Sequence, residues 1–493
     1  MELLGRSIRN LLIAPRRIAV VDDTRAWRAI HLYGGALHLA REIERRTTRP
    51  HIGLMLPTSG LTPMSVLATW ALGRTIVPIN YLLPSGQRDN IIRNAELDTV
   101  ITVTPMIERF GDLPGAVQQI RLDRLSFGGL PPLRRPVSRP EDHIAALLYT
   151  SGTSGGPKGV MLTAGNLTAN VRQCVEWAAL PRRTVFLGVL PQFHCFGLTV
   201  LTLLPLWLGS KAVYTARFAP KRVLELLLEH QPTIVLAIPS MLNSLLNAKD
   251  ATREHFSSVR YLVSGGEPLP QSVFDGFRER FGITLNEGYG LTETSPVTNW
   301  CRPEEHKRGS VGPALPGVQQ KIVSLDGSIL GANEEGEVRI KGPNLMKGYY
   351  KLEEETAAAF DEEGFFRTGD IGRIDADGHL FITGRLKEMM VIGGENVFPR
   401  TIEEVLDRHP DVLCSAVIGI PDPVRGEAAV AFVELVAGAD FDETLLRGHC
   451  RQRLAPYQVP RRVIRLETMP RNATGKVLRR ELRAILDEQR VSL

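Results

Sequence analysis

The 493-residue sequence has few cysteines, almost no excess of charge of either sign, and no sign of a metal-binding cluster. Its five cysteines lie far apart and fit no metal-ligand spacing, which indicates isolated thiols in a reducing compartment. Lys and Arg outnumber Asp and Glu by only 59 to 54. Because nucleic-acid binding needs a clustered basic stripe, no nucleic-acid partner is expected.

Long apolar runs are also missing. The longest, residues 198–208, is interrupted by Thr199, Thr202 and Pro205 and is shorter than the roughly 20 residues of a spanning helix. The first eight residues contain an early acid and no apolar core, so they are not a signal peptide. We therefore expect a cytoplasmic protein without a transmembrane segment, and leave its oligomeric state open.

The pattern that is present alternates strands with helices. Helical spacing of apolar residues predicts helices over 30–43 and 221–230. Short apolar runs predict strands over 51–56, 75–79, 99–103, 144–149, 233–238, 260–263 and 282–285. Such alternation is typical of an α/β fold with helices on both faces of a parallel sheet.

Two changes in pattern divide the chain. Residues 310–383 show short strands separated by glycine-bearing turns, which indicates a small β-barrel-like unit. After Gly384 the pattern resets to a compact mixture of strand and helix. The prediction is a large N-terminal domain of α/β layers with the β unit, residues 1–384, and a small α+β C-terminal domain, residues 385–493.

A loop rich in glycine and hydroxyl groups follows the strand predicted at 144–149. Glycine lets the backbone approach a ligand closely, and the amides of such a loop form a concavity that binds anions. The candidate phosphate ligands are Thr150, Ser151, Gly152, Thr153, Ser154, Gly155 and Lys158. A Walker A loop needs glycine before the lysine and serine or threonine after it, whereas Pro157 and Gly159 stand there. A magnesium ligand must therefore come from elsewhere.

Two further motifs supply suitable groups. In 287–294, Tyr289 lies between Gly288 and Gly290, and an unflanked ring can lie flat against a nucleobase. Glu293 is the oxygen ligand that magnesium prefers, and Thr292 offers a hydroxyl to phosphate. Asp370 follows a glycine turn, where its carboxylate can accept hydrogen bonds from ribose hydroxyls. Taken one at a time, each motif is also compatible with an ordinary turn.

Seven motifs occur along the chain in one order: 149–159, 191–194, 264–268, 288–293, 367–370, 384–388 and 472–476. Together they make the chain resemble the adenylate-forming superfamily, which includes acyl-CoA synthetases, peptide-synthetase adenylation domains and firefly luciferase. The resemblance implies two half-reactions. A carboxylate attacks the α-phosphate of ATP, giving acyl-adenylate and pyrophosphate, and a thiol then takes the acyl group.

The resemblance also implies roles for single residues. The 149–159 loop would hold the β- and γ-phosphates, Glu293 would bind Mg²⁺, and Thr292 would contact the α-phosphate. Adenine would lie between Tyr289 and the segment Gly266, Glu267 and Pro268. Glu287, which stands where many relatives carry glutamine or asparagine, would lie near the adenine amino group, while Asp370 and Arg385 would hold the ribose.

The C-terminal domain would be mobile. Lys476 would bridge the reacting carboxylate and the α-phosphate, where a positive charge stabilises the charge that develops. Lys387 would be the hinge about which the domain rotates between half-reactions. Rotation would bring Gly393 and Gly394 beside the pantetheine arm of the thiol, and His194 would gate that channel or contact the acyl group.

Residues 181–210 contain no acidic residue to pair with a substrate amine, and the run from Phe193 to Leu201 is apolar. This favours a hydrophobic acid, with a medium- or long-chain fatty acid first and an aryl acid next. Coenzyme A is the expected acceptor, and the phosphopantetheine of an acyl carrier protein is the alternative. Two other classes are compatible with parts of the pattern: a phosphate-loop NTPase, which Pro157 and Gly159 disfavour, and a non-catalytic nucleotide-binding protein.

Overall fold

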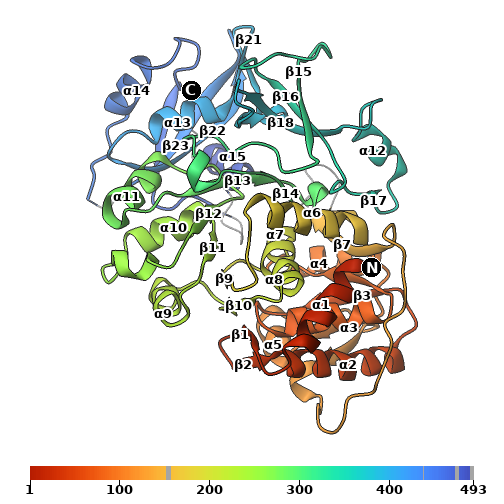
Figure 1. Ribbon diagram of the computed structural model, residues 1–493. Coiled ribbons are helices and arrows are strands. Elements are labelled where there is room, and N and C mark those ends of the chain that lie inside the picture. Colours follow the sequence, from red (N-terminus) through yellow and green to blue (C-terminus); the bar gives the residue numbers. More distant parts are fainter. Residues whose placement is uncertain (151–156, 437, 472–476, 489–493) are drawn as a thin grey trace.

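The computed structural model describes residues 1–150, 157–436, 438–471 and 477–488. Two largely parallel sheets form the N-terminal part, and an antiparallel sheet and a final mixed sheet follow them. Figure 1 shows the C-terminal elements, coloured blue, at the top of the view and the first elements of the chain, coloured red and orange, at the bottom. The predicted α/β class, with a large N-terminal and a small C-terminal domain, is confirmed.

The first sheet has the order β14-β13-β12-β11-β9-β10-β1-β2 within the described residues. Its strands are β14 (Val297–Trp300), β13 (Asn286–Gly290), β12 (Tyr261–Ser264), β11 (Ile234–Ala237), β9 (Val185–Gly188), β10 (Lys211–Tyr214), β1 (Ile18–Val21) and β2 (Ala26–Arg28). Only the two edge pairs, β1 with β2 and β13 with β14, are antiparallel among these strands.

The second sheet has the order β17-β8-β7-β4-β3-β5-β6. Its strands are β17 (Gly348–Tyr349), β8 (Lys158–Thr163), β7 (Ile144–Thr150), β4 (Thr75–Pro78), β3 (His51–Met55), β5 (Thr99–Thr102) and β6 (Gln118–Arg121). Every residue of β3, β4 and β5 is buried, as expected of parallel strands covered on both faces.

Helices cover both sheets (Figure 1). They are α1 (Glu2–Ile13), α2 (Ala29–Arg46), α3 (Leu61–Ala71), α4 (Ser85–Asn94), α5 (Thr104–Phe110), α6 (Ala164–Trp177), α7 (Cys195–Leu198), α8 (Leu204–Leu208), α9 (Pro220–His230), α10 (Pro239–Leu246) and α11 (Gln271–Phe281). Helix α9 has Pro220 in its first turn, and Gln231, in the left-handed conformation, ends the helix. The long apolar run predicted to be too short for a membrane forms the buried segment α7 to α8. Across the described ranges, no helix is both long and apolar enough to span a bilayer.

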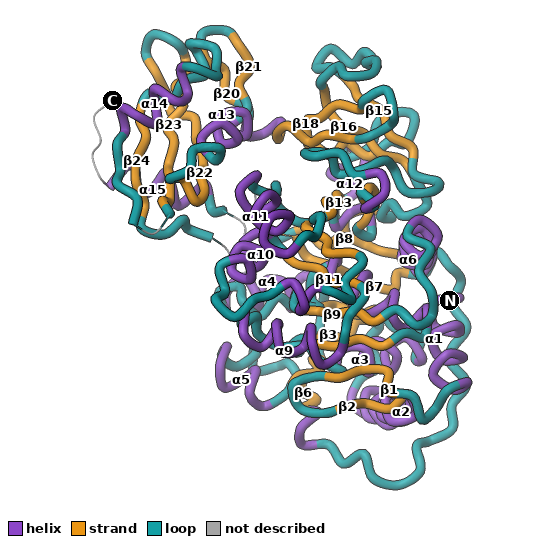
Figure 2. The backbone as a smooth tube through the Cα atoms, turned by 60° about the vertical axis from the view of Figure 1, so that its left-hand side comes forward, coloured by secondary structure: helices purple, strands orange, loops and turns teal. Residues whose placement is uncertain are grey.

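The β unit is the antiparallel sheet β15 (Gln319–Val323), β16 (Gly336–Lys341), β18 (Phe366–Ile374) and β19 (Leu380–Arg385). A short helix, α12 (Glu353–Ala358), lies between β17 and β18 in the chain. The last sheet joins β20 (Met390–Ile392), β21 (Glu395–Val397), β22 (Val412–Asp422), β23 (Gly426–Leu435) and β24 (Arg462–Leu466), with α13 (Pro399–Leu406), α14 (Glu443–Arg451) and α15 (Arg479–Glu488) around it. Figure 2 shows this group set to one side of the rest.

The hydrophobic cores follow this division. One core spans both N-terminal sheets, and a second, which includes Phe277, lies against the first sheet. The last sheet has separate cores on its two sides, built around Ile402 and Phe432. A separate core is expected of a unit that rotates as a body. The boundary between residues 384 and 385 and the hinge at Lys387 stay predictions.

One predicted strand is wrong. Residues 282–285 form no strand, because Gly282 adopts a left-handed conformation that ends α11. The strand is instead β13, which begins at Asn286 and includes the tyrosine motif itself. The motif is therefore part of a strand, paired with β12 and β14, rather than a loop that follows one.

Candidate active site

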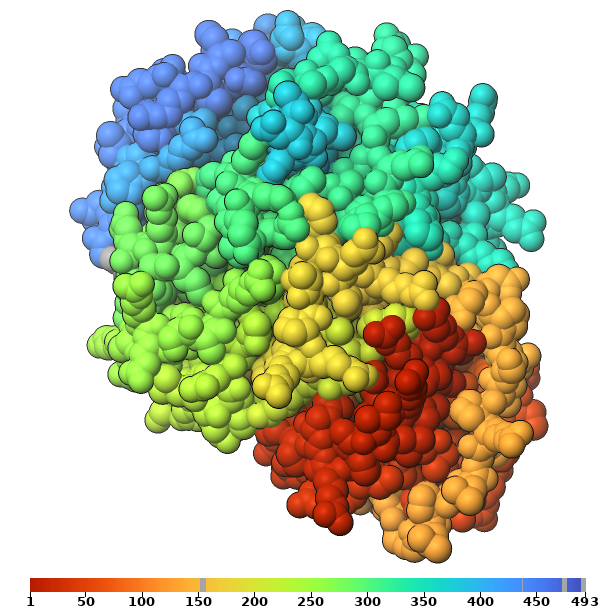
Figure 3. Space-filling view, viewed as in Figure 1, coloured from red at the N-terminus to blue at the C-terminus, as the bar shows by residue number. Residues whose placement is uncertain are grey.

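Most of the predicted nucleotide ligands line one cavity of about 420 Å³, which we call the motif cavity. It lies between the N-terminal part and the last sheet. Figure 3 shows the atoms of these two parts in contact along their boundary. The predicted residues on its wall are Gly266, Glu267, Pro268, Glu287, Gly288, Tyr289, Gly290, Asp370 and Arg385. They come from four separate segments, so the fold brings together what the sequence keeps apart.

Asp370 is the most constrained of these residues. Its side chain is 2% exposed, and β-sheet pairing places it opposite Arg385. The Arg385 guanidinium lies 2.9 Å from one carboxylate oxygen, and the Tyr289 hydroxyl donates to the other at 2.6 Å. Burial and the charge of Asp370 raise the pKa of Tyr289, so this tyrosine remains a neutral donor. These contacts hold the carboxylate in one orientation.

Gly290 also has a structural role. A Cβ at this position would lie 1.9 Å from the carbonyl oxygen of Pro296, so only glycine allows β13 and the following turn to approach so closely. Gly266 lies in the left-handed region with φ of +86°, which also favours glycine.

Glu287 and Glu267 are both engaged by arginine. Arg308 lies 2.7 Å from the Glu287 carboxylate, and Arg471, which comes from the C-terminal part, lies 3.4 Å from that of Glu267. Arg471 was not predicted, although it directly precedes the motif at 472–476. It connects the last sheet to the loop after β12.

Glu293 lies just beyond the motif cavity, in a short 3₁₀ turn after β13. Its carboxylate accepts a hydrogen bond of 3.0 Å from the Tyr349 hydroxyl, and burial raises the pKa of Glu293. A cation beside it would oppose that shift, because an adjacent positive charge stabilises the ionised form. One carboxylate fits Mg²⁺, which usually binds one or two carboxylates together with substrate phosphates. Among the described residues, no cluster of three acidic, histidine or cysteine side chains offers a fuller cage.

Tyr349 also connects Glu293 to the predicted phosphate loop. The Lys158 ammonium lies 5.1 Å from the centre of the Tyr349 ring, within the range of a cation–π contact. Thr150 and Lys158 face each other across the antiparallel pair β7 and β8, so the two ends of the loop are held together. Ser151, Gly152, Thr153, Ser154, Gly155 and Lys476 lie outside the described residues.

A second cavity, of about 1240 Å³, has mainly hydrophobic walls, and we call it the apolar cavity. It lies where the carboxyl ends of strands from both N-terminal sheets meet, the usual place for ligands in α/β folds. His194 and Thr292 line it. Gly266, Glu267 and Gly290 belong to both cavities, which therefore adjoin at the end of β12 and β13.

His194 is largely enclosed by protein. Burial lowers its pKa to about 4, so the imidazole is neutral near pH 7. Its Nε2 atom has no hydrogen-bond partner among the described residues, and its ring packs at a tilt against Phe193 with centroids 4.7 Å apart. A neutral ring on the cavity wall suits contact with a ligand better than proton transfer to one.

Acidic residues from outside the segment 181–210 also line the apolar cavity. Asp22 is the most buried of them, and its carboxylate accepts hydrogen bonds from the Trp27 indole at 2.8 Å and the Gly60 amide at 2.9 Å. Asp23 accepts one from the Ala216 amide at 2.8 Å. Both carboxylates hold loops in place, and neither was predicted, because they are far from His194 in sequence.

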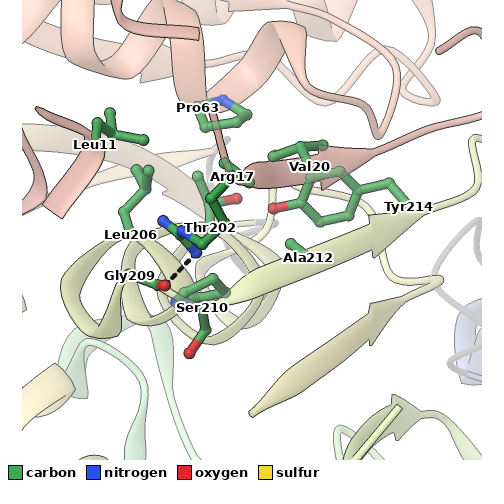
Figure 4. A pocket seen from close by; sticks show the side chains of 12 residues that line it. Leu11, Arg17, Val20, Pro63, Thr202, Leu206, Gly209, Ser210, Ala212 and Tyr214 are labelled. Carbon is green, nitrogen blue, oxygen red and sulfur yellow. Dashed lines mark hydrogen bonds between the residues drawn. The ribbon is translucent and has the colours of Figure 1, made fainter. Parts of the chain in front are cut away.

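Lys387, Gly393 and Gly394 line neither cavity. The two glycines form the turn between β20 and β21, and both have positive φ. A third pocket, between α1 and β10, holds only about 10 Å³ (Figure 4). Arg17 closes it with a hydrogen bond to the Gly209 carbonyl, which leaves room for little more than a water molecule.

Comparison with known proteins agrees with this arrangement. The AMP-binding enzyme family matches residues 12–350, and the C-terminal domain of AMP-binding enzymes matches residues 401–476. The chain belongs to the AMP-binding enzyme family. The predicted adenylate-forming superfamily is thereby confirmed.

The names of individual relatives describe different acid substrates. The chain is 38% identical to a long-chain-fatty-acid–CoA ligase of Bacillus subtilis over 70% of its own length and 62% of that protein. It is 34% identical to a sulfoacetate–CoA ligase of Cupriavidus necator, over 87% and 86% of the two chains. Its fold is similar to ATP-bound MatB of Rhodopseudomonas palustris, with a TM-score of 0.89, 29% identity, and coverage of 98% and 99%.

Proposed function

We propose that this chain is an AMP-forming ligase that activates a hydrophobic carboxylic acid, preferably a medium- or long-chain fatty acid, and transfers it to coenzyme A. The observation that carries the proposal is the junction of the motif cavity with the apolar cavity at Gly266, Glu267 and Gly290. A nucleotide in one and an acyl chain in the other would meet there.

In the first half-reaction, a carboxylate oxygen of the acid attacks the α-phosphorus of ATP, and the bond to the β-phosphate oxygen breaks. Pyrophosphate leaves with the electron pair. Asp370 and Arg385 orient the ribose, and Tyr289 and Glu287 border the base. Glu293 would hold Mg²⁺, which offsets the charge of the phosphates. Lys476, assigned from the sequence motif, would stabilise the same charge as it builds up.

In the second half-reaction, the thiolate of coenzyme A attacks the acyl carbonyl carbon and displaces AMP. Gly393 and Gly394 line neither cavity. The proposed rotation about Lys387 would bring them to the junction. Separate cores for the last sheet support such a rotation.

The acid class rests on the walls of the apolar cavity. They include the buried side chains of Leu122, Val103 and Met106, and burial of an alkyl chain against them is favourable at roughly 25 cal/mol per Å². Coenzyme A is chosen over a carrier protein because the names of the two relatives above specify CoA. Sulfoacetate in one of those names shows why the acid needs a direct test.

The test is a panel of fatty, aryl, amino and small anionic acids with ATP and Mg²⁺. Pyrophosphate release measures the first half-reaction, and mass spectrometry of the acyl-CoA product measures the second. We expect AMP, pyrophosphate and acyl-CoA with hydrophobic acids. Release of ADP would indicate a phosphate-loop NTPase, and turnover only with small anionic or amino acids would contradict the acid class.

A further inference from the structure

Tyr81 is the residue on which this inference rests. It follows β4 and lines the apolar cavity, and its side chain is 8% exposed. Its ring packs edge-on against Phe193 with centroids 4.8 Å apart, and at a tilt against Phe110 at the same distance. Two aromatic contacts of this kind fix the position of the phenol.

The Tyr81 hydroxyl makes no hydrogen bond to any described residue, and in this it differs from the other most buried tyrosines. Tyr214 donates to the Leu201 carbonyl, and Tyr261 donates to the Ala178 carbonyl at 3.0 Å. Tyr289 and Tyr349 donate to carboxylates. The Tyr81 oxygen is not among the enclosed atoms that lack a partner in the described residues, so it is accessible from the cavity and can take a partner there.

Two hydroxyls on the same wall are already satisfied within the protein. The Thr58 hydroxyl donates to the Leu190 carbonyl at 3.4 Å, and the Ser59 hydroxyl to the Pro57 carbonyl at 3.1 Å. Water can serve Tyr81 while the cavity is open, but an alkyl chain that displaces the water would leave the hydroxyl buried without a partner. That loss opposes binding of a purely apolar chain.

The contacts also place Tyr81 away from the reacting end. The Cys195 thiol lies 3.9 Å from the carbonyl oxygen of Thr292. From the neighbouring His194, ring contacts lead through Phe193 to Tyr81 and then to Phe110. A group that meets Tyr81 is therefore on the tail of the acid rather than at its carboxylate.

We propose that Tyr81 donates a hydrogen bond to an oxygen on the tail of the acyl substrate, and that the preferred acid is hydrophobic but carries a hydroxyl, oxo or ether group along its chain. This rests on the proposed function and narrows its substrate class. Burial raises the pKa of Tyr81 to about 12, so the phenol is a neutral donor at working pH. No covalent step involves it.

The experiment compares acids of equal length with and without one oxygen substituent, moved stepwise along the chain. Pyrophosphate release gives kcat/KM for wild type and for Tyr81→Phe, which keeps the ring and its packing. At the best position we expect wild type to prefer the substituted acid about 10-fold, and Tyr81→Phe to lose most of that preference while using the plain acid at least as well.

Tyr33→Phe is the matched control. It removes a hydroxyl from a partly buried tyrosine of α2 that does not line the cavity, so the preference should remain. Equal use of plain and substituted acids at every position, or a preference that survives in Tyr81→Phe, would overturn the proposal. If no acid releases pyrophosphate, the proposed function fails instead. Calorimetric binding of the same acid pairs to both proteins then decides the role of Tyr81.

Discussion

The motif cavity and the apolar cavity share a wall but are built in opposite ways. In the motif cavity the charged groups are held by other side chains: Asp370 by Arg385 and Tyr289, and Glu287 by Arg308. In the apolar cavity, by contrast, the side chains of Tyr81 and His194 have no hydrogen-bond partner among the described residues. The charged groups of the motif cavity are therefore already oriented for one ligand. In the apolar cavity, Tyr81 and His194 can still form hydrogen bonds with a substrate.

The difference has a physical reason. A nucleotide is charged, and charged groups bind best where donors and acceptors are already oriented, since reorienting them costs free energy. An acyl tail is bound mainly by removal of apolar surface from water, which needs volume and shape more than orientation. Changes in the motif cavity should therefore affect all acids alike, and changes in the apolar cavity should affect some acids more than others.

The largest expected effect is that of Lys476→Ala. If the lysine stabilises the charge at the α-phosphate, its removal should lower the rate of acyl-adenylate formation by about 1000-fold with every acid, while ATP still binds. Single-turnover adenylate formation and calorimetric ATP binding measure the two effects. Adenylation at the wild-type rate would refute the assigned role.

Asp370→Asn should come next. The substitution removes the charge that holds Arg385, and hydrogen bonds to charged groups are worth about 1.5–3 kcal/mol. We expect kcat/KM for ATP to fall about 100-fold, with the ranking of acids unchanged. Asp377→Asn is a control, because Asp377 is an exposed ion-pair partner of Lys307 outside both cavities. An altered ranking of acids would contradict the separation of the two cavities.

Met106→Trp should produce a smaller and selective effect. Met106 is a buried residue of α5 on the wall of the apolar cavity, and tryptophan would occupy part of its volume. We expect kcat/KM for the longest acids to fall about 10-fold, with shorter acids and the KM for ATP little changed. An equal loss for all chain lengths would place the acyl tail elsewhere.

The smallest expected effect concerns pH. The pKa of His194 is lowered to about 4 in the fold, so between pH 7 and 5.5 the unfolded chain binds a proton there that the folded chain does not. Stability must then fall as pH falls, by about 1 kcal/mol over this range for this one group. His194→Gln should lose less stability than wild type over the same interval in urea unfolding at the two pH values. Identical pH dependence would show that His194 titrates normally.

Much of this protein was predictable from local sequence. Runs such as 51–56 and 99–103 became the buried strands β3 and β5, and the motifs in order indicated the family that the comparisons confirmed. The strand expected at 282–285 was wrong, because periodicity alone does not show that Gly282 caps a helix. The domain boundary and the roles of single residues stay predictions.

The residues that were missed share one property, which is that tertiary contacts alone bring them to the site. Tyr349 meets Glu293 because β17 pairs with β8, and Arg471 meets Glu267 because the last sheet lies against the N-terminal part. Neither lies in a motif, and their spacing from their partners in the chain carries no signal.

The sequence by itself determined the α/β class, the order of the motifs and hence the chemistry expected of them, because glycine, hydroxyl and charged residues at short spacing constrain the backbone locally. Only the tertiary structure decided which groups face each other and how large each cavity is. Those properties depend on how strands from distant segments end along a common edge, and that is set by packing of the whole core rather than by any one stretch of the chain.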